Sequence, residues 1–130
     1  MKRSAGFTVV EILVAIIFLG AAALLLLIQK GNLEAAKRDQ DRKVAINAMY
    51  YNLEEVFYEK NNYYPAKVDS KVLRAMDPEL FTDPHGVKMN EEGAGYRYEG
   101  LDCNNDICRA YKLTSAMEKE AEYVKTNRNK

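Results

Sequence analysis

Histidine, cysteine and excess charge are all scarce in this sequence. It has one histidine, His85, two cysteines, and 19 basic residues balanced by 19 acidic ones. The balance gives no basic field to attract nucleic acid and no acidic field to favour disorder. The sequence also lacks a glycine-rich phosphate loop, a histidine pair for a metal and a nucleophile elbow. We therefore expect a chain that is not an enzyme and holds no cofactor.

Metal binding has equally little support. Structural zinc needs four ligands, and His85 has no second cluster of ligands nearby. His85 is expected to lie in a surface turn. The oxygen-rich residues Asp102, Asn104, Asn105 and Asp106 lack the remaining ligands and the glycine of a calcium loop, so a solvated turn is expected there.

One long apolar run lies near the N-terminus. Phe7 to Ile28 contains a single charged residue, and as a helix it is long enough to cross a hydrocarbon core of about 30 Å. Lys2 and Arg3 precede the run, which predicts that the N-terminus stays in the cytoplasm and the remainder lies outside. A cleaved secretory signal is the alternative, with Ala21–Ala23 as the cut site. Leu24 to Ile28 argue against it, because the apolar run continues past that site.

Glu11 interrupts this apolar helix. An acid inside a membrane helix costs about 2.5 to 3.5 kcal/mol and is seldom kept without a partner. One interpretation is that Glu11 pairs with a cation. The other is that Glu11, being close to the helix start, reaches the headgroup layer, where water and the helix N-terminus satisfy it.

The segment from Lys2 to Glu11, KRSAGFTVVE, resembles the prepilin leader of type IV pilins and type II secretion pseudopilins. The resemblance implies that a prepilin peptidase cuts between Gly6 and Phe7 and that the new N-terminal residue, Phe7, is N-methylated. Glu11 matches the family glutamate that is thought to pair with the N-terminal amine of a neighbouring subunit. Such a pair is favoured in a low dielectric, because each charge is costly alone. Glu11 and Phe7 are thus the expected residues of subunit assembly.

Two more positions in the apolar helix bear on the resemblance. Gly20 lies where the family commonly has a glycine, whose weak helix propensity permits local unwinding. Ile28 stands where many major pilins carry a proline. This difference favours a more continuous helix, as in a minor pilin or a pseudopilin.

The chain is expected to have three parts: a leader at residues 1–6, a transmembrane and filament-core helix at residues 7–28, and residues 29–130 outside the cytoplasm. The last part begins with an amphipathic helix, which Asn61, Asn62 and the following Pro65 end. Apolar side chains recur in it at three- and four-residue spacings, and this stripe is suited to covering a sheet. The stripe comprises Ala45, Ile46, Met49, Tyr50, Leu53, Val56 and Phe57.

The segments after the helix alternate between strand and turn patterns. Val87–Met89, Tyr96–Glu99 and Arg109–Leu113 alternate in side-chain type as half-buried strands do. Lys71–Met76 predicts a short helical turn, and Thr82–Gly86 has turn chemistry. A resemblance to the globular part of pilins and pseudopilins is carried by an ordered set: Tyr64–Pro65, Asp83–Pro84 with Gly86, Tyr96 and Tyr98, and Tyr111–Leu113 through Met117–Glu118. The predicted fold is α+β, with a long N-terminal helix packed on a small antiparallel sheet, which is the pilin fold.

Cys103 and Cys108 lie close together in the sequence, so a bond between them would close a short loop. A disulfide is expected if this part is outside the cytoplasm, and two free thiols are the alternative in a reducing compartment.

The C-terminal region allows more than one prediction. Ser115–Glu118 has the pattern of a capping box that would open a short helix through Val124, and a turn is the alternative. Residues 123–130 interleave cations with a tyrosine, which makes DNA a partner to consider. Nearby acidic residues dilute that field, so we expect a frayed terminus without support for DNA binding. These acids are Glu118, Glu120 and Glu122.

The resemblance implies a structural subunit that self-associates into a helical filament. Its expected partners are other copies of itself, the prepilin peptidase, an inner-membrane assembly platform and, before assembly, membrane lipid. It would span the inner membrane once and then lie in a pilus or pseudopilus at the cell surface. A pseudopilin of a secretion or DNA-uptake system is one alternative, and a monomeric signal-anchored binding protein is another.

Overall fold

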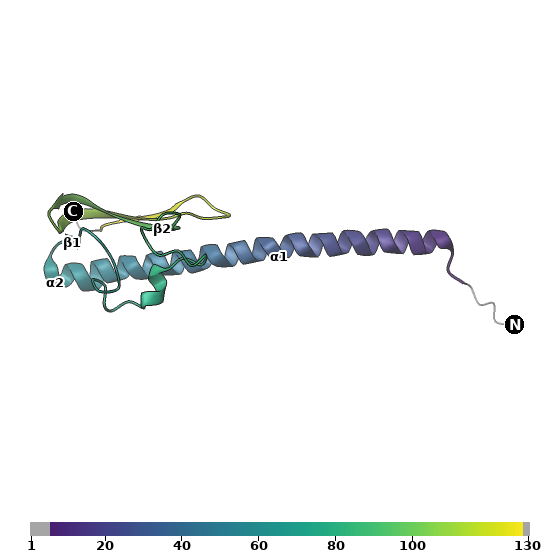
Figure 1. The fold of residues 1–130 in the computed structure, drawn as a ribbon, viewed down its shortest axis with the longest axis horizontal. Helices are drawn as coiled ribbons and strands as arrows, with labels where there is room; N and C mark the ends of the chain where they lie inside the picture. Colours follow the sequence, from purple (N-terminus) through teal and green to yellow (C-terminus); the bar gives the residue numbers. More distant parts are fainter. Residues whose placement is uncertain (1–5, 129–130) are drawn as a thin grey trace. The chain divides into compact units, whose positions relative to one another are not determined.

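The computed structural model describes residues 6–128, which form one long helix and a small antiparallel sheet (Figure 1). Helix α1 spans Val9–Tyr51, continues as a π-helical segment η1, Asn52–Tyr58, and ends with α2, Glu59–Asn61. The chain divides after Ala35 into an N-terminal unit and a head. The α+β fold expected from the sequence is confirmed. Residues 1–5, which include Lys2 and Arg3, lie outside the described residues.

The helix ends where the sequence predicts. Asn62 takes a left-handed conformation with φ of 59°, and its N–H donates to the Tyr58 carbonyl at 2.7 Å. Asparagine tolerates this conformation better than most residues, so it allows the chain to turn back. Strand β1, Tyr64–Pro65, follows at once.

The head is built around the amphipathic part of the helix. The predicted stripe is confirmed: Ala45, Ile46, Met49 and Leu53 are at most 1% exposed. Tyr50, Val56 and Phe57 are partly buried. Other members of the core come from the sheet and loops, namely Tyr64, Val68, Leu73, Met76, Phe81, Tyr96, Tyr98, Cys108, Tyr111 and Leu113.

The sheet is antiparallel and has β3, Ile107–Ser115, at its centre. Strand β2, Tyr96–Asn104, pairs along the whole of β3, from Tyr96 opposite Ser115 to Asn104 opposite Ile107. On the other side, β1 pairs with the start of β3, and β4, Tyr123–Thr126, pairs with its end. The predicted strands at Tyr96–Glu99 and Arg109–Leu113 are therefore confirmed as parts of β2 and β3.

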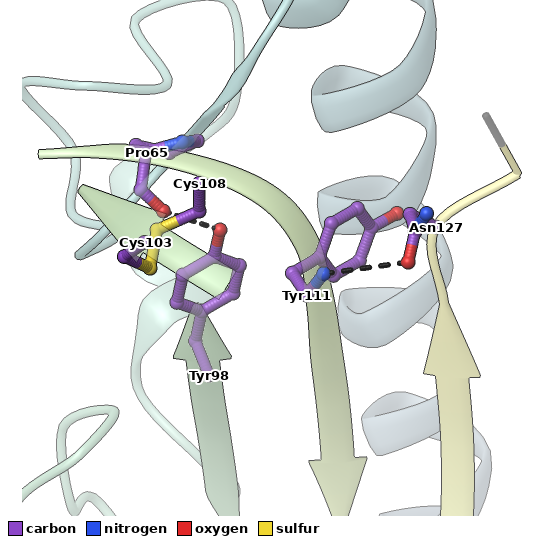
Figure 2. Close-up of a disulfide and its surroundings, with 6 residues drawn as sticks. All are labelled: Pro65, Tyr98, Cys103, Cys108, Tyr111 and Asn127. Atoms are coloured by element: carbon purple, nitrogen blue, oxygen red, sulfur yellow. Dashed lines mark hydrogen bonds between the residues drawn. A yellow bond between two sulfur atoms is a disulfide. The ribbon is translucent and has the colours of Figure 1, made fainter. Parts of the chain in front are cut away.

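Cys103 and Cys108 form a disulfide across the β2–β3 hairpin, where they are register partners (Figure 2). Gly100 lies beneath this bond, and a Cβ there would come within 2.7 Å of the Cys108 sulfur. Any larger residue at Gly100 would therefore displace the disulfide. Beside it, the Tyr98 hydroxyl donates to the Pro65 carbonyl at 2.6 Å and ties β2 to β1.

The turn at Thr82–Gly86 is confirmed. The Gly86 N–H donates to the Asp83 carbonyl at 2.9 Å, and Gly86 has a φ of 85°, which favours glycine. The Asp83 carboxylate accepts from the N–H groups of His85 and Val87. His85 is exposed in this turn, as expected. Lys71–Met76 consists of turns and bends. One helical turn begins just before it, where the Leu73 N–H donates to the Asp69 carbonyl, and the Met76 N–H donates to the Leu73 carbonyl.

The strand predicted at Val87–Met89 is wrong. The only pairing there, within residues 6–128, is an isolated bridge between Lys88 and Thr82. The Met89 N–H donates to the Phe81 carbonyl, and the Asp83 N–H donates to the Val87 carbonyl. Because the segment closes on the loop just before it, it does not join the sheet.

Both the helix predicted to open at Ser115–Glu118 and the frayed end predicted from Tyr123 are wrong. Residues 118–121 form bends, and Tyr123–Thr126 is strand β4. The capping box does not form because the Glu118 N–H donates to Asp39 of α1. Residues 129 and 130 of the tail lie outside the described residues.

Candidate functional site

The apolar segment from Phe7 to Ile28 is exposed along its whole length in the isolated chain. Its large side chains range from 46% exposed at Val14 to 83% at Phe7. Within the described residues, one helix is long and apolar enough to cross a membrane, and this segment supplies its apolar part. A continuous apolar surface of this kind is stable only when lipid or protein covers it.

Glu11 forms a reciprocal cap with Thr8 at the start of α1. The Thr8 N–H donates to Glu11 Oε2 at 2.9 Å, and the Thr8 hydroxyl donates to the same oxygen at 3.0 Å. The Glu11 N–H in turn donates a hydrogen bond to Thr8 Oγ1 at 3.3 Å. This is the capping-box arrangement, in which the side chains of the first helical turn satisfy its free N–H groups. In the isolated chain, the helix N-terminus therefore satisfies the Glu11 carboxylate, which is one part of the second interpretation; the contact with headgroups and water stays a prediction.

Gly6 and Phe7 lie before the helix, in irregular exposed backbone. A Cβ added at Gly6 would meet nothing within 4 Å, and Gly6 has no positive φ that would call for glycine. Gly20 is equally open, although it lies inside α1, where glycine costs about 1 kcal/mol relative to alanine. Neither glycine is required by contacts within the described chain, so both are open to requirements set by other molecules.

A buried ionic cluster joins α1 to the segment after β3. Asp39 and Arg42 are 2% and 3% exposed, and Arg42 Nη1 donates to Asp39 Oδ1 at 2.8 Å and to Glu118 Oε1 at 2.9 Å. The Arg38 guanidinium donates two hydrogen bonds to the Glu118 carboxylate, from Nε to Oε1 at 2.8 Å and from Nη2 to Oε2 at 2.7 Å. The Asp39 carboxylate also accepts from the N–H groups of Glu118 and Lys119. This cluster fixes the path of the chain between β3 and β4.

Lowering the pH is expected to destabilise the head through Asp39 and Glu118. Burial acts to raise the pKa of Asp39, but the N–H groups of Glu118 and Lys119 and the Arg42 guanidinium outweigh it, so the pKa lies below 3.8. Arg38 holds the pKa of Glu118 below 4.5. Because both pKa values are lower in the folded than in the unfolded chain, their stabilisation is complete above about pH 4.5 and is lost as the pH falls through the folded values.

Urea unfolding, followed by the near-ultraviolet circular dichroism of the tyrosines, measures this decline between about pH 7 and about pH 3. The variant Glu118→Gln is expected to show a shallower decline over the same range, because one of the two titrating groups is gone. A stability of the unaltered protein that stays constant down to about pH 3 would contradict the assignment.

A second buried carboxylate, Glu54, lies in the π-helical segment η1 and is 1% exposed. It accepts hydrogen bonds from the Tyr111 hydroxyl at 2.8 Å, from the Tyr64 hydroxyl at 3.0 Å and from the Arg128 N–H at 3.0 Å. Burial, followed by the hydrogen bond to Glu54, raises the pKa of Tyr111, so its hydroxyl stays protonated and donates. Asn127, drawn in Figure 2, accepts from the Tyr111 N–H at 3.4 Å. These bonds hold the end of the described chain against the helix and the sheet.

Sequence reasoning did not single out Asp39, Arg42 or Glu54. A signal for the first two was present, since Asp39 and Arg42 continue the spacing of the buried stripe toward the N-terminus. Glu54 follows the buried Leu53 directly, as the buried Ile46 follows Ala45 in α1, so both pairs lie at the centre of the helix face that the sheet covers. No cluster of three metal-ligating side chains occurs within residues 6–128.

Comparison with known proteins gives no relative from which to transfer a function. No family model matches the chain, and no match is found among the curated proteins or the solved structures.

Proposed function

We propose that this chain is a structural subunit of a type IV pilus-like filament. In this proposal its apolar helix first anchors it in the inner membrane, a prepilin peptidase cuts it between Gly6 and Phe7, and the helices of many copies then bundle into the filament core. The observation that carries the proposal is the exposed apolar segment from Phe7 to Ile28, which contains one acid within its first helical turns.

The leader pattern supports processing at this place. The bond between Gly6 and Phe7 lies in exposed, non-helical backbone, as a peptidase substrate requires, and the only charge in the apolar segment follows five residues after Gly6. Once the bond is cut, Phe7 carries a free amine. The Glu11 carboxylate of a second copy is then a partner for that amine in a low dielectric, where charge pairs are strong and single charges are costly.

Helix packing supplies the rest of the assembly. Lipid and neighbouring helices cover apolar surface about equally well, so close van der Waals packing and interhelical polar contacts decide association. An open filament requires a heterologous contact that does not close on itself. The head, which has its own core, would then lie outside the bundle.

The N-terminus of the native protein tests this proposal. We expect mass spectrometry of protein taken from its native cells to find a chain that begins with N-methylated Phe7. Substitution Gly6→Leu should leave an uncut chain in the membrane fraction, because it changes the residue after which the peptidase is expected to cut. The fold should be unaffected, since a Cβ at Gly6 meets nothing within 4 Å. An intact Met1, or a start far from Phe7, would instead favour a monomeric signal-anchored protein.

A pseudopilin of a secretion or DNA-uptake system is a second candidate. Helix α1 runs from Val9 to Tyr51 without interruption at Ile28, where many major pilins have a proline. That continuity favours a minor pilin or a pseudopilin over a major pilin. Imaging of filaments that contain labelled protein, inside the envelope or beyond the cell surface, separates the two.

A further inference from the structure

A groove with an apolar floor lies between the end of the helix and the turns that follow β1. Two adjoining hollows of about 430 and 490 Å³ form it, and Phe57 and Val72 line both of them. An edge-to-face contact with Tyr63, with ring centroids 5.6 Å apart, holds Phe57 in place. All three side chains are half-buried, so the floor is already formed in the isolated chain and is still open to a ligand.

Four cations surround this floor. Lys60 and Arg74 line the first hollow, and Lys67 and Lys71 line the second. All four are exposed, and none forms an ion pair within residues 6–128. Asp106 is the one acid among the described residues that line the two hollows. We call this surface the basic groove.

Hydrogen bonds fix the turn that carries two of the cations. The Lys71 N–H donates to the Asp69 carboxylate at 2.8 Å, and Arg74 Nε donates to the Lys71 carbonyl at 3.1 Å. The Leu73 N–H donates to the Asp69 carbonyl at 3.0 Å. A surface that is ordered before binding loses less conformational entropy when a ligand arrives.

The acids nearest to the basic groove leave it positively charged. Asp69 and Glu91 line a neighbouring hollow of about 400 Å³, where Lys88 accompanies them. Glu55, in the helix segment beside the groove, pairs with Arg128 at 2.6 Å. The groove itself therefore keeps an excess of cations around its apolar floor.

The arrangement of floor and cations defines a recognition pattern. Alternate side chains of an extended peptide lie on one side of it, about 7 Å apart. An apolar side chain on the floor would then have one carboxylate beside Lys60 and Arg74. A second carboxylate would lie beside Lys67 and Lys71. The pattern is acid, any residue, apolar residue, any residue, acid.

We propose that the basic groove binds an extended segment of another protein, in which two carboxylates flank one large apolar side chain. Charge complementarity selects the acidic residues, and the floor selects the apolar one. The inference concerns the head alone, so it goes beyond the proposed filament function and does not depend on it.

A second copy of this chain does not supply such a segment. The pattern occurs twice in the sequence, at 55–59 and at 79–83. The first occurrence lies in the helix, where Phe57 is itself part of the groove floor. In the second, Phe81 and Asp83 are 7% and 5% exposed. Neither is free to enter the groove of another copy.

Peptide binding to the full-length chain, held in nanodiscs of phosphatidylcholine, tests the groove. The probe is the rhodamine-labelled peptide Gly-Ser-Glu-Ser-Leu-Ser-Glu-Ser-Gly, and fluorescence anisotropy measures its affinity at about 0.1 M salt. We expect saturable binding. Replacing both glutamates of the peptide with lysine should weaken binding by about tenfold or more, and replacing its leucine with serine by about fivefold or more.

The chain offers a groove variant and a matched control. Lys71→Glu combined with Arg74→Glu should weaken binding of the glutamate peptide by about tenfold and should now favour the lysine peptide, which also shows that the variant is folded. Arg97→Glu combined with Lys112→Glu replaces the same two residue types at exposed positions of β2 and β3. This control should bind the glutamate peptide within about twofold of the unaltered chain.

Three results would overturn the inference: no saturable binding of the glutamate peptide, equal affinity for the lysine peptide, or an equal loss in the control variant. Self-association of the unaltered chain in sedimentation, if the groove variant abolished it, would also overturn the inference, because the occupant would then be a second copy. None of these measurements depends on the cut after Gly6 or on filaments, so failure of the groove and failure of the proposed function remain distinguishable.

Discussion

Replacing Glu11 with glutamine is expected to reduce incorporation into filaments by about tenfold or more while leaving the chain inserted in the membrane. Glutamine at this position still satisfies a capping box, so the helix start keeps its hydrogen bonds with Thr8. It loses the charge that would pair with the amine of Phe7 in a neighbouring copy. Hydrogen bonds to charged groups contribute about 1.5 to 3 kcal/mol, which corresponds to about tenfold or more in an equilibrium.

The structure supplies the control for this experiment. Thr8→Val removes the hydroxyl of the cap but keeps the Glu11 charge, so it should weaken the helix start by about 1 kcal/mol and leave filament incorporation near normal. The amounts of each variant in the membrane and in sheared filaments are compared by immunoblotting. If Glu11→Gln assembles normally, or if Thr8→Val fails equally, Glu11 acts as a helix cap and the pairing role is wrong.

Replacing Glu54 with leucine is expected to lower the free energy of unfolding of the head by about 3 to 5 kcal/mol. The change leaves two tyrosine hydroxyls, of Tyr64 and Tyr111, without this acceptor in positions that are 0% exposed. It also frees the Arg128 N–H, which ties the C-terminal segment to the helix. Against a typical domain stability of about 5 to 15 kcal/mol, this loss is a large share of the total.

The neighbouring glutamate provides the comparison. Glu55 is exposed and contacts the Arg128 side chain at 2.6 Å, so Glu55→Leu should cost less than about 1 kcal/mol. Urea unfolding of both variants at neutral pH, with tyrosine circular dichroism as the signal, measures the difference. Equal stability losses for Glu54→Leu and Glu55→Leu would show that the buried network does not stabilise the head.

The apolar stripe of the helix and the strand predicted at Val87–Met89 show how much a sequence pattern can predict. Ala45, Ile46, Met49 and Leu53 follow the helical period, and the structure buries all of them. Val87–Met89 also has a clear alternating pattern, yet it pairs only with the loop before it. Alternation reports that a segment suits a half-buried strand, and it does not report which edge is available for pairing.

The C-terminal region shows the same limit. Ser115–Glu118 satisfies the local pattern of a helix start, but the Glu118 N–H and carboxylate are taken by Asp39, Arg38 and Arg42 of a distant helix. These bonds are about 80 residues apart in the sequence, with separations of 79, 80 and 76. A local capping preference of about 1 kcal/mol does not compete with several charged hydrogen bonds to a preformed helix.

By itself the sequence determined the apolar segment, its single acid, the point where the helix ends and the α+β class, because each depends on residues that are neighbours along the chain. The tertiary structure decided the buried Asp39–Arg42–Glu118 cluster, the Glu54 network and the strand at Tyr123–Thr126. In these features a charged or polar group is stable only because partners from distant segments surround it. Such partnerships are set by how the head packs, which no local pattern records.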